Sequence, residues 1–171
     1  MSAAPGHSPA RSPDIPQGEA TSLSAVTDPG QWQAPAWLDD RTRLALLAAA
    51  QAARVQAHAP YSRFAVGAAV LDEHGQIHPG CNVENAAYPQ GVCAEAGAIS
   101  AMVLAGGRRI RAVLVVGDAP SWVTPCGGCR QKIREFATGD TPVLLANPQG
   151  WQATLTLEQL LPHSFGPDHL A

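Results

Sequence analysis

Residues 93–136 read CAEAGAISAMVLAGGRRIRAVLVVGDAPSWVTPCGGCRQKIREF, and this segment decides the fold. It predicts three elements: a helix over about 93–104, a buried strand over 111–116 and a second helix over 126–136. Gly106-Gly107 ends the first helix, and Cys93 and Cys126 each open a helix. Because each helix follows a strand, we expect the two helices to run parallel and to bring Cys93 beside the Cys126-x-x-Cys129 pair.

The flanking sequence continues the alternation of helices and strands. We expect a helix over about 39–58, a hairpin of strands 64–71 and 76–83 around a turn at 72–75, a strand over 142–146, an edge strand near 154–155 and a helical turn over 157–161. Asp39 or Asp40 can cap the first helix. This order predicts an α/β protein, with three α/β/α layers around one mixed sheet of about five strands.

The N-terminal part of the chain has a different composition. Residues 1–36 are interrupted by six X-Pro steps and lack an apolar period, so they predict a disordered, Pro-rich tail. The ordered domain is expected to span residues 37–171. Trp32 and Trp37, near the end of the tail, either dock onto the domain or stay exposed to solvent.

Length and composition exclude several classes of protein. The chain has 171 residues, room for one domain, and a net charge of −3, which argues against a nucleic-acid partner. No apolar run approaches the roughly 18 to 20 residues of a membrane span, and the N-terminus lacks the features of a secretory signal. The chain has four cysteines, which fit a reducing cytoplasm better than a disulfide scaffold. We therefore expect a cytoplasmic protein with no membrane partner.

Three thiols and one carboxylate have the spacing of a catalytic zinc site. Cys126 and Cys129 are one helical turn apart, so both sulfurs can reach one ion, and Cys93 adds a third. A helix N-terminus favours the thiolate through its dipole and its free N–H groups. Three protein ligands leave the fourth tetrahedral position open to water. Glu95 is close enough to handle protons at that water without binding the metal.

The Cys126-x-x-Cys129 pair alone has other interpretations, namely a redox pair or a structural zinc site. A redox pair would not need a third thiol and a carboxylate, and a structural zinc site would need a fourth Cys or His. Cys81 lies at the end of a predicted strand, where a small buried residue is the simpler interpretation, and no His lies near these motifs. The shortage of a fourth ligand favours an open, catalytic site.

Five motifs in the same order resemble cytidine deaminase of the small, homotetrameric, three-cysteine type. They are YSRFAVGAA (61–69), GCNVENAAY (80–88), CAE (93–95), PCGGCRQ (125–131) and LLPHSFGP (160–167). The resemblance runs from about residue 39 to the C-terminus. It implies hydrolytic deamination of cytidine and 2′-deoxycytidine to uridine and 2′-deoxyuridine, with ammonia released and one Zn²⁺ per subunit. Alternatives are a deaminase of another cytosine compound, such as blasticidin S, and a non-catalytic zinc-binding homologue.

The resemblance also implies a role for each matching residue. Its zinc ligands would be Cys93, Cys126 and Cys129, and Glu95 would shuttle protons. The residues at the substrate would be Phe64 against the base, the Ala94 N–H at the pyrimidine O2, Asn82 and Glu84 at the ribose 3′-hydroxyl, and Ala86, Tyr88 and Phe165 near a neighbouring subunit's substrate.

Some of these roles have a structural alternative. Asn82 and Glu84 are two residues apart at a strand end and point to one side, but they could instead close a loop through hydrogen bonds. Tyr88 and Phe165 could be plain core residues.

One departure from the family pattern concerns charge: Ala96 follows Glu95 where many relatives have an Arg that bonds the zinc thiolates. Arg130 is the nearest other cation in sequence.

Overall fold

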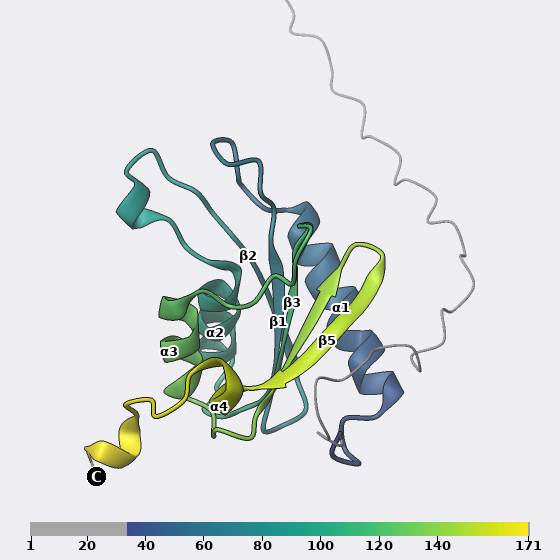
Figure 1. Cartoon of the computed structure of the whole chain (residues 1–171), viewed down its shortest axis with the longest axis vertical. Coiled ribbons are helices and arrows are strands. Elements are labelled where there is room, and N and C mark those ends of the chain that lie inside the picture. The colour runs from purple at the N-terminus through teal and green to yellow at the C-terminus, as the bar shows by residue number, and fades with distance from the viewer. Residues whose placement is uncertain (1–33, 171) are drawn as a thin grey trace, which may run out of the picture.

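The centre of the fold is a mixed five-stranded sheet, seen in the computed structural model, which describes residues 34–170 (Figure 1). Its strands are β1 (Gly67–Asp72), β2 (Ile77–Cys81), β3 (Ile110–Val116), β4 (Pro142–Asn147) and β5 (Gly150–Thr156). They lie in the order β2-β1-β3-β4-β5. Only β3 and β4 are parallel, and the other neighbouring pairs are antiparallel. The predicted mixed sheet is confirmed.

Helices cover both faces of this sheet, as expected. Helix α1 (Asp40–Val55) packs on one face, and α2 (Ala94–Leu104) and α3 (Gly127–Arg134) lie together on the other (Figure 1). Successive β3 residues alternate between the two cores, because side chains on a strand point to opposite faces. Val113 and Val115 contact the α2 and α3 side, whereas Leu114 packs on the α1 side. The three-layer α/β/α prediction is therefore confirmed.

Several elements are shorter than predicted: α1 ends at Val55 rather than near 58, β2 ends at Cys81 rather than 83, and α3 ends at Arg134 rather than 136. The first hairpin strand begins at Gly67 rather than Phe64, because the Asn82 side chain hydrogen-bonds the backbone of Phe64 and Val66 in place of a ladder partner. Strand β5 is longer than the predicted edge strand near 154–155. The remaining short elements are the 3₁₀ helices η2 (Tyr88–Gln90) and η3 (Pro167–His169) and the helix α4 (Leu157–Leu160).

The residues before α1 contact the domain. The Arg111 guanidinium lies over the Trp37 ring, 4.2 Å from its centroid, and Leu38 is buried in the core beneath α1. Trp37 therefore docks onto the domain, which was one of its two predicted alternatives. Trp32 and most of the predicted 1–36 tail lie outside the described residues. Among residues 34–170, no helix combines the length and the apolar character needed to cross a membrane.

Gly80 allows α2 to lie close against β2. A Cβ at Gly80 would collide with the Ala94 carbonyl oxygen and the Ala98 backbone nitrogen, both in α2. Backbone atoms of a helix cannot move aside as a flexible side chain can. We therefore expect Gly80→Ala to lower the free energy of unfolding by about 1–3 kcal/mol, the usual range for overpacking. Chemical denaturation of the purified variant measures this loss.

Gly91→Ala is the matched control for that substitution. A Cβ at Gly91 would make only ordinary contacts, the nearest at 3.4 Å from the Tyr88 carbonyl oxygen. The backbone φ of Gly91 is −63°, which alanine adopts without strain. Unfolding free energies that are equal in the two variants would contradict the close approach of α2 to β2.

Candidate active site

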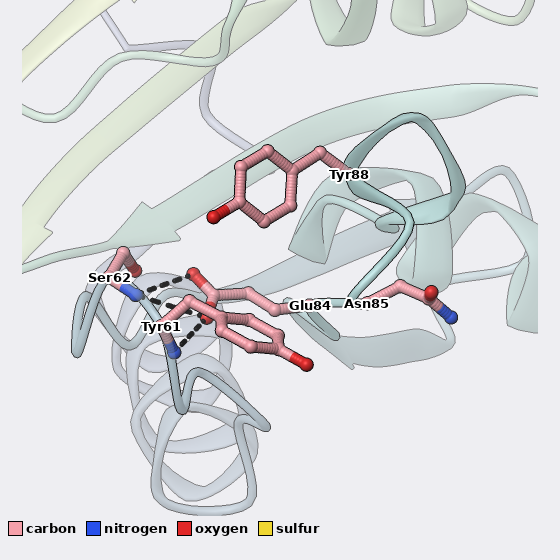
Figure 2. A pocket seen from close by; sticks show the side chains of 5 residues that line it. All are labelled: Tyr61, Ser62, Glu84, Asn85 and Tyr88. Atoms are coloured by element: carbon pink, nitrogen blue, oxygen red, sulfur yellow. Dashed lines mark hydrogen bonds between the residues drawn. The ribbon is translucent and has the colours of Figure 1, made fainter.

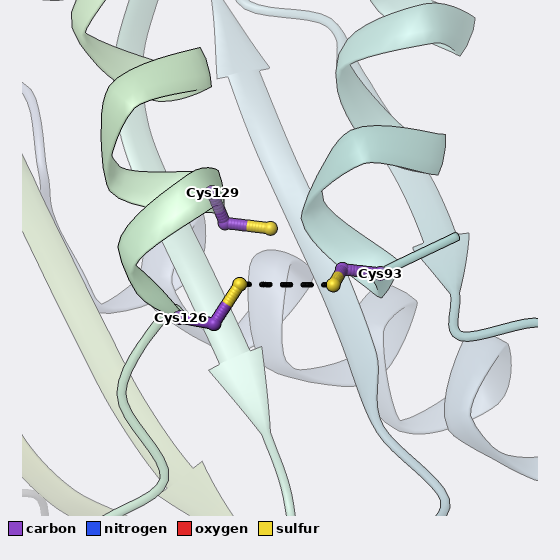
Figure 3. Close-up of side chains that lie close together, drawn as sticks. All are labelled: Cys93, Cys126 and Cys129. Carbon is purple, nitrogen blue, oxygen red and sulfur yellow. Dashed lines mark hydrogen bonds between the residues drawn. The ribbon is translucent and has the colours of Figure 1, made fainter. Parts of the chain in front are cut away.

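The two helices on one face of the sheet begin at cysteines. Cys93 is the N-cap of α2 and Cys126 is the N-cap of α3, and the backbone carbonyl of each accepts the first helical hydrogen bond. Neither side chain caps its helix by a hydrogen bond. Cys129 lies in the first turn of α3, so it faces the same space as the two N-caps (Figure 3). The prediction that parallel helices bring the cysteines together is confirmed.

The three sulfurs have the spacing that one metal ion requires. The Sγ atoms of Cys93 and Cys126 are 3.7 Å apart, and all three Sγ atoms lie within 4.8 Å of one another. Two sulfurs bound tetrahedrally to zinc at about 2.3 Å would be about 3.8 Å apart. Within residues 34–170, this is the only cluster of three or more Cys, His, Asp or Glu side chains that could hold a metal ion. The donor set therefore fits a three-cysteine zinc site.

The electrostatics of the thiols favour a bound cation. Burial, and then the negative charges of Glu95 and Cys93, raise the pKa of Cys129. Burial and the hydrogen bond with Cys126 also raise the pKa of Cys93. The pKa of Cys126 is lowered: burial opposes this shift, but hydrogen bonds from the Cys129 N–H and from the other two thiols outweigh it. Three thiolates together therefore need a cation beside them.

Glu95 is buried beside the cluster in the first turn of α2. Glu95 is only 4% exposed to solvent. Burial raises the pKa of the Glu95 carboxyl, and its own backbone N–H, the Cys129 thiol and the charge of Lys132 partly oppose that rise. A carboxyl group whose pKa is shifted toward neutrality can both accept and return a proton.

A cavity of about 290 Å³ opens onto the cluster near the carboxyl end of β3. It is lined by Ser62, Phe64, Val66, Asn82, Glu84, Cys93, Ala94, Glu95, Val115, Val123, Thr124 and Cys126. Five predicted catalytic or substrate residues are therefore in one place: Phe64, Asn82, Glu84, Ala94 and Glu95. The sequence prediction missed Ser62, Val66, Val115, Val123 and Thr124. The pair Val123-Thr124 could have been suggested by its position directly before Pro125.

Asn82 and Glu84 hold the loop that forms one wall of the cavity. The Asn82 Oδ1 accepts a hydrogen bond from the Val66 N–H at 2.8 Å, and Nδ2 donates to the Phe64 carbonyl at 2.9 Å. The Glu84 carboxylate accepts from the Tyr61 N–H at 2.8 Å and the Ser62 N–H at 3.2 Å (Figure 2). Both side chains therefore close the loop through hydrogen bonds, as the alternative prediction expected, and their role at the ribose stays a prediction. These bonds leave one Asn82 N–H and further carboxylate lone pairs for a ligand.

Comparison with known proteins assigns this arrangement to a family. Residues 40–145 match the model described as the cytidine and deoxycytidylate deaminase zinc-binding region. The chain belongs to the cytidine deaminase family. A cytidine deaminase of Sporosarcina psychrophila is 46% identical over 126 residues, covering 74% of this chain and 93% of that protein. One of Mycobacterium tuberculosis is 43% identical over 114 residues, covering 67% of this chain and 82% of that protein.

Solved structures agree with this assignment. The crystal structure of cytidine deaminase from Burkholderia pseudomallei superposes with a TM-score of 0.68 at 43% identity, covering 71% of this chain and 98% of that chain. That of cytidine deaminase from Mycobacterium tuberculosis gives 0.61 at 39% identity, covering 72% and 97% respectively. The family assignment therefore rests on sequence and on fold, and it confirms the predicted resemblance.

Three predicted substrate residues of this deaminase lie outside the cavity of their own chain. Ala86 is exposed, Tyr88 is 77% exposed and Phe165 is 58% exposed, so Tyr88 and Phe165 are not core residues. Tyr88 packs edge-on against Tyr61, with ring centroids 6.0 Å apart, and both line an adjoining hollow of about 430 Å³ (Figure 2). The Phe165 ring stacks on His169 beyond α4.

Arg130 does not serve the cluster as a counter-ion through direct contact. Its guanidinium donates hydrogen bonds to the Pro125 carbonyl at 2.7 Å, the Leu160 carbonyl at 2.8 Å and the Thr124 hydroxyl at 2.9 Å. These bonds connect the loop before Cys126 to the end of α4. Arg130 in this deaminase therefore fixes the approach of the chain to the second cysteine, and its guanidinium hydrogen-bonds neutral groups rather than the thiols.

Proposed function

We propose that this deaminase hydrolyses cytidine and 2′-deoxycytidine to uridine and 2′-deoxyuridine with release of ammonia. The observation that carries the proposal is a buried carboxyl, Glu95, beside three converging thiols in a cavity of about 290 Å³. The cavity is small enough to favour a single nucleoside over a longer ligand. The named activity of the relatives supports the same reaction.

The proposed zinc ligands are Cys93, Cys126 and Cys129. When bound there, zinc supplies hydroxide near neutral pH by lowering the pKa of a water molecule from 15.7 to about 7. Glu95 takes a proton from the attacking water and passes it to N3 of the pyrimidine, which makes C4 more electrophilic. Once the water oxygen has bonded to C4, Glu95 takes the remaining proton from that oxygen and delivers it to the amino group. The C4–N bond then breaks and ammonia leaves.

The proposed substrate contacts follow from the residues around the cavity. The Phe64 ring packs on the base. The Ala94 N–H donates to the pyrimidine O2, because N–H groups in the first turn of a helix have no partner within the helix. Asn82 and Glu84 bind the ribose 3′-hydroxyl. They use the Asn82 N–H and the Glu84 carboxylate lone pairs that their hydrogen bonds to the loop leave free. In this proposal the same two side chains hold the cavity wall and recognise the sugar.

A substrate panel tests the proposal. Purified, zinc-loaded protein is incubated with cytidine, 2′-deoxycytidine, cytosine, single-stranded DNA and blasticidin S, and ammonia release is measured. We expect turnover of the two nucleosides, because only they offer both the base and a free ribose 3′-hydroxyl. Turnover of blasticidin S alone would favour the other small-molecule deaminase, and turnover of single-stranded DNA would favour a polynucleotide deaminase.

We further propose a homotetramer in which Ala86, Tyr88 and Phe165 contact the substrate of a neighbouring subunit. The exposure of these residues supports this arrangement, because large apolar rings on a surface suit an interface. The C-terminal segment that carries Phe165 is also held firmly. The Gln131 side chain donates to the Phe165 carbonyl at 2.9 Å, and Arg134 bonds Ser164 and Asp168.

Complementation between two inactive variants tests the shared site. We expect Phe165→Ala and Glu95→Gln each to lose activity, and co-expression of both to restore part of it. With random assortment of subunits, about a quarter of the sites would combine an intact Glu95 with a neighbour's intact Phe165. Light scattering on the same samples gives the oligomeric state. Full activity in Phe165→Ala, or a monomer with full activity, would contradict the proposal.

We also propose a cytoplasmic location. The four cysteines of the chain are free, and the three at the cluster must stay reduced to bind a metal. A reducing compartment keeps them so. Fractionation of cells that express the full chain tests this proposal, and recovery outside the cytoplasmic fraction would contradict it.

A further inference from the structure

The site of the proposed function holds an excess of negative charge. Three thiolates around one Zn²⁺ leave a net negative charge, and ionised Glu95 beside them adds another. Uncompensated charge in a partly buried site is unfavourable. Ala96, the residue after Glu95, contributes no charge, and the Arg130 guanidinium donates its hydrogen bonds to Pro125, Thr124 and Leu160 rather than to a thiolate.

Lys132, the one lysine of the chain, lies where it can supply a positive charge. It is in α3, three residues after Cys129 and four after Gly128, so its side chain neighbours both positions on the helix surface. Its Nζ is 3.7 Å from the position that a Cβ on Gly128 would take. The side chain therefore runs back along α3 toward the turn that holds Cys126 and Cys129.

The direction of the Lys132 side chain has an electrostatic consequence. A cation near a helix N-terminus opposes the helix dipole, so this position is unfavourable unless negative charge lies nearby. Negative charge is present at this end of α3, because the proposed thiolate ligands Cys126 and Cys129 lie at its N-cap and in its first turn and Glu95 is buried beside them. Gly128, with no side chain, leaves the space beside this ammonium clear.

We propose that Lys132 is a positioning residue that balances the charge of the thiolates and Glu95 and thereby strengthens zinc binding. The inference rests on the proposed zinc site and adds a residue to it. Lys132 is exposed to solvent, so its effect acts through space and is screened by salt. A role in packing alone would not depend on salt.

Zinc affinity, measured by competition with a chromophoric chelator, tests the proposal without relying on turnover. We expect Lys132→Met to weaken zinc binding roughly tenfold at low ionic strength, and the difference to shrink at 1 M salt. Lys132→Arg should bind zinc nearly as well as the wild-type protein, because it keeps the charge. Ala96→Arg combined with Lys132→Met should recover affinity, because it returns a cation to the same cluster from α2.

Arg109→Met is the control, since it removes one exposed positive charge away from the cluster. Equal zinc affinity in Lys132→Met, Arg109→Met and the wild-type protein at low salt would overturn the proposal. So would a loss in Lys132→Met that Lys132→Arg shares and that salt does not reduce. Failure of the wild-type protein to bind zinc would instead overturn the zinc site of the proposed function, and this inference with it.

Discussion

Replacing Glu95 by Gln is expected to lower the rate of cytidine deamination by roughly 10⁴-fold, the upper end of the range for general acid–base catalysis. Glutamine has the same shape, so it fits a position that is 4% exposed, but it cannot take a proton from water or return one. Zinc should stay bound, because Glu95 is not among the three proposed ligands. Steady-state kcat and the zinc content of the same preparation measure the two expectations.

The control for this variant is Glu135→Gln, at the exposed end of α3. It removes one carboxylate without touching the cavity, and its kcat should equal that of the wild-type protein. Near-normal turnover in zinc-loaded Glu95→Gln would exclude Glu95 as the proton shuttle. Loss of zinc from that variant would mean that Glu95 binds the metal, which the proposed mechanism does not allow.

Replacing Cys129 by Ser is expected to abolish stoichiometric zinc binding and, with it, activity. Cys129 is fully buried between α2 and α3, and its sulfur completes the three-thiol cluster. A serine hydroxyl is a poor replacement for a thiolate as a zinc ligand. Zinc that binds the folded protein also stabilises it, and the variant loses this effect. The thermal midpoint of the variant should therefore no longer rise when zinc is added.

Cys81→Ser is the matched control, because it replaces the one cysteine that lies outside the cluster. We expect it to keep one zinc per chain and the zinc-dependent rise in thermal midpoint. Zinc content by metal analysis and a thermal scan with and without zinc are the measurements. Full zinc content in Cys129→Ser, or loss of zinc in Cys81→Ser, would contradict the ligand set.

The sequence was sufficient for the features that depend on local pattern. Cys93 and Cys126 were predicted to open helices, and both are helix N-caps. The Val-rich run of β3 predicted a buried strand, and its residues reach into both cores. Helix starts and buried strands have local signatures, so the convergence of the thiols could be inferred before the structure.

Features that depend on distant partners could not be predicted in this way. The first hairpin strand begins at Gly67 because Asn82, far along the chain, binds the loop before it. The Arg130 guanidinium donates to the Leu160 carbonyl, thirty residues on, a partner that local pattern does not indicate. Because Gln152 and Thr154 are polar, the sequence pattern did not indicate most of β5 as a strand. This strand forms by pairing with β4, which is a tertiary contact. Side-chain direction and edge-strand length thus required the three-dimensional structure.

The most direct test of the central claim is whether the conversion of cytidine depends on bound zinc. Uridine and ammonia are measured with the protein as zinc-loaded, after chelation, and after zinc is restored. The account predicts equal amounts of uridine and ammonia with zinc present, loss of both after chelation, and recovery on reloading. No conversion by a folded protein with one zinc per chain, or full conversion after complete removal of zinc, would contradict it.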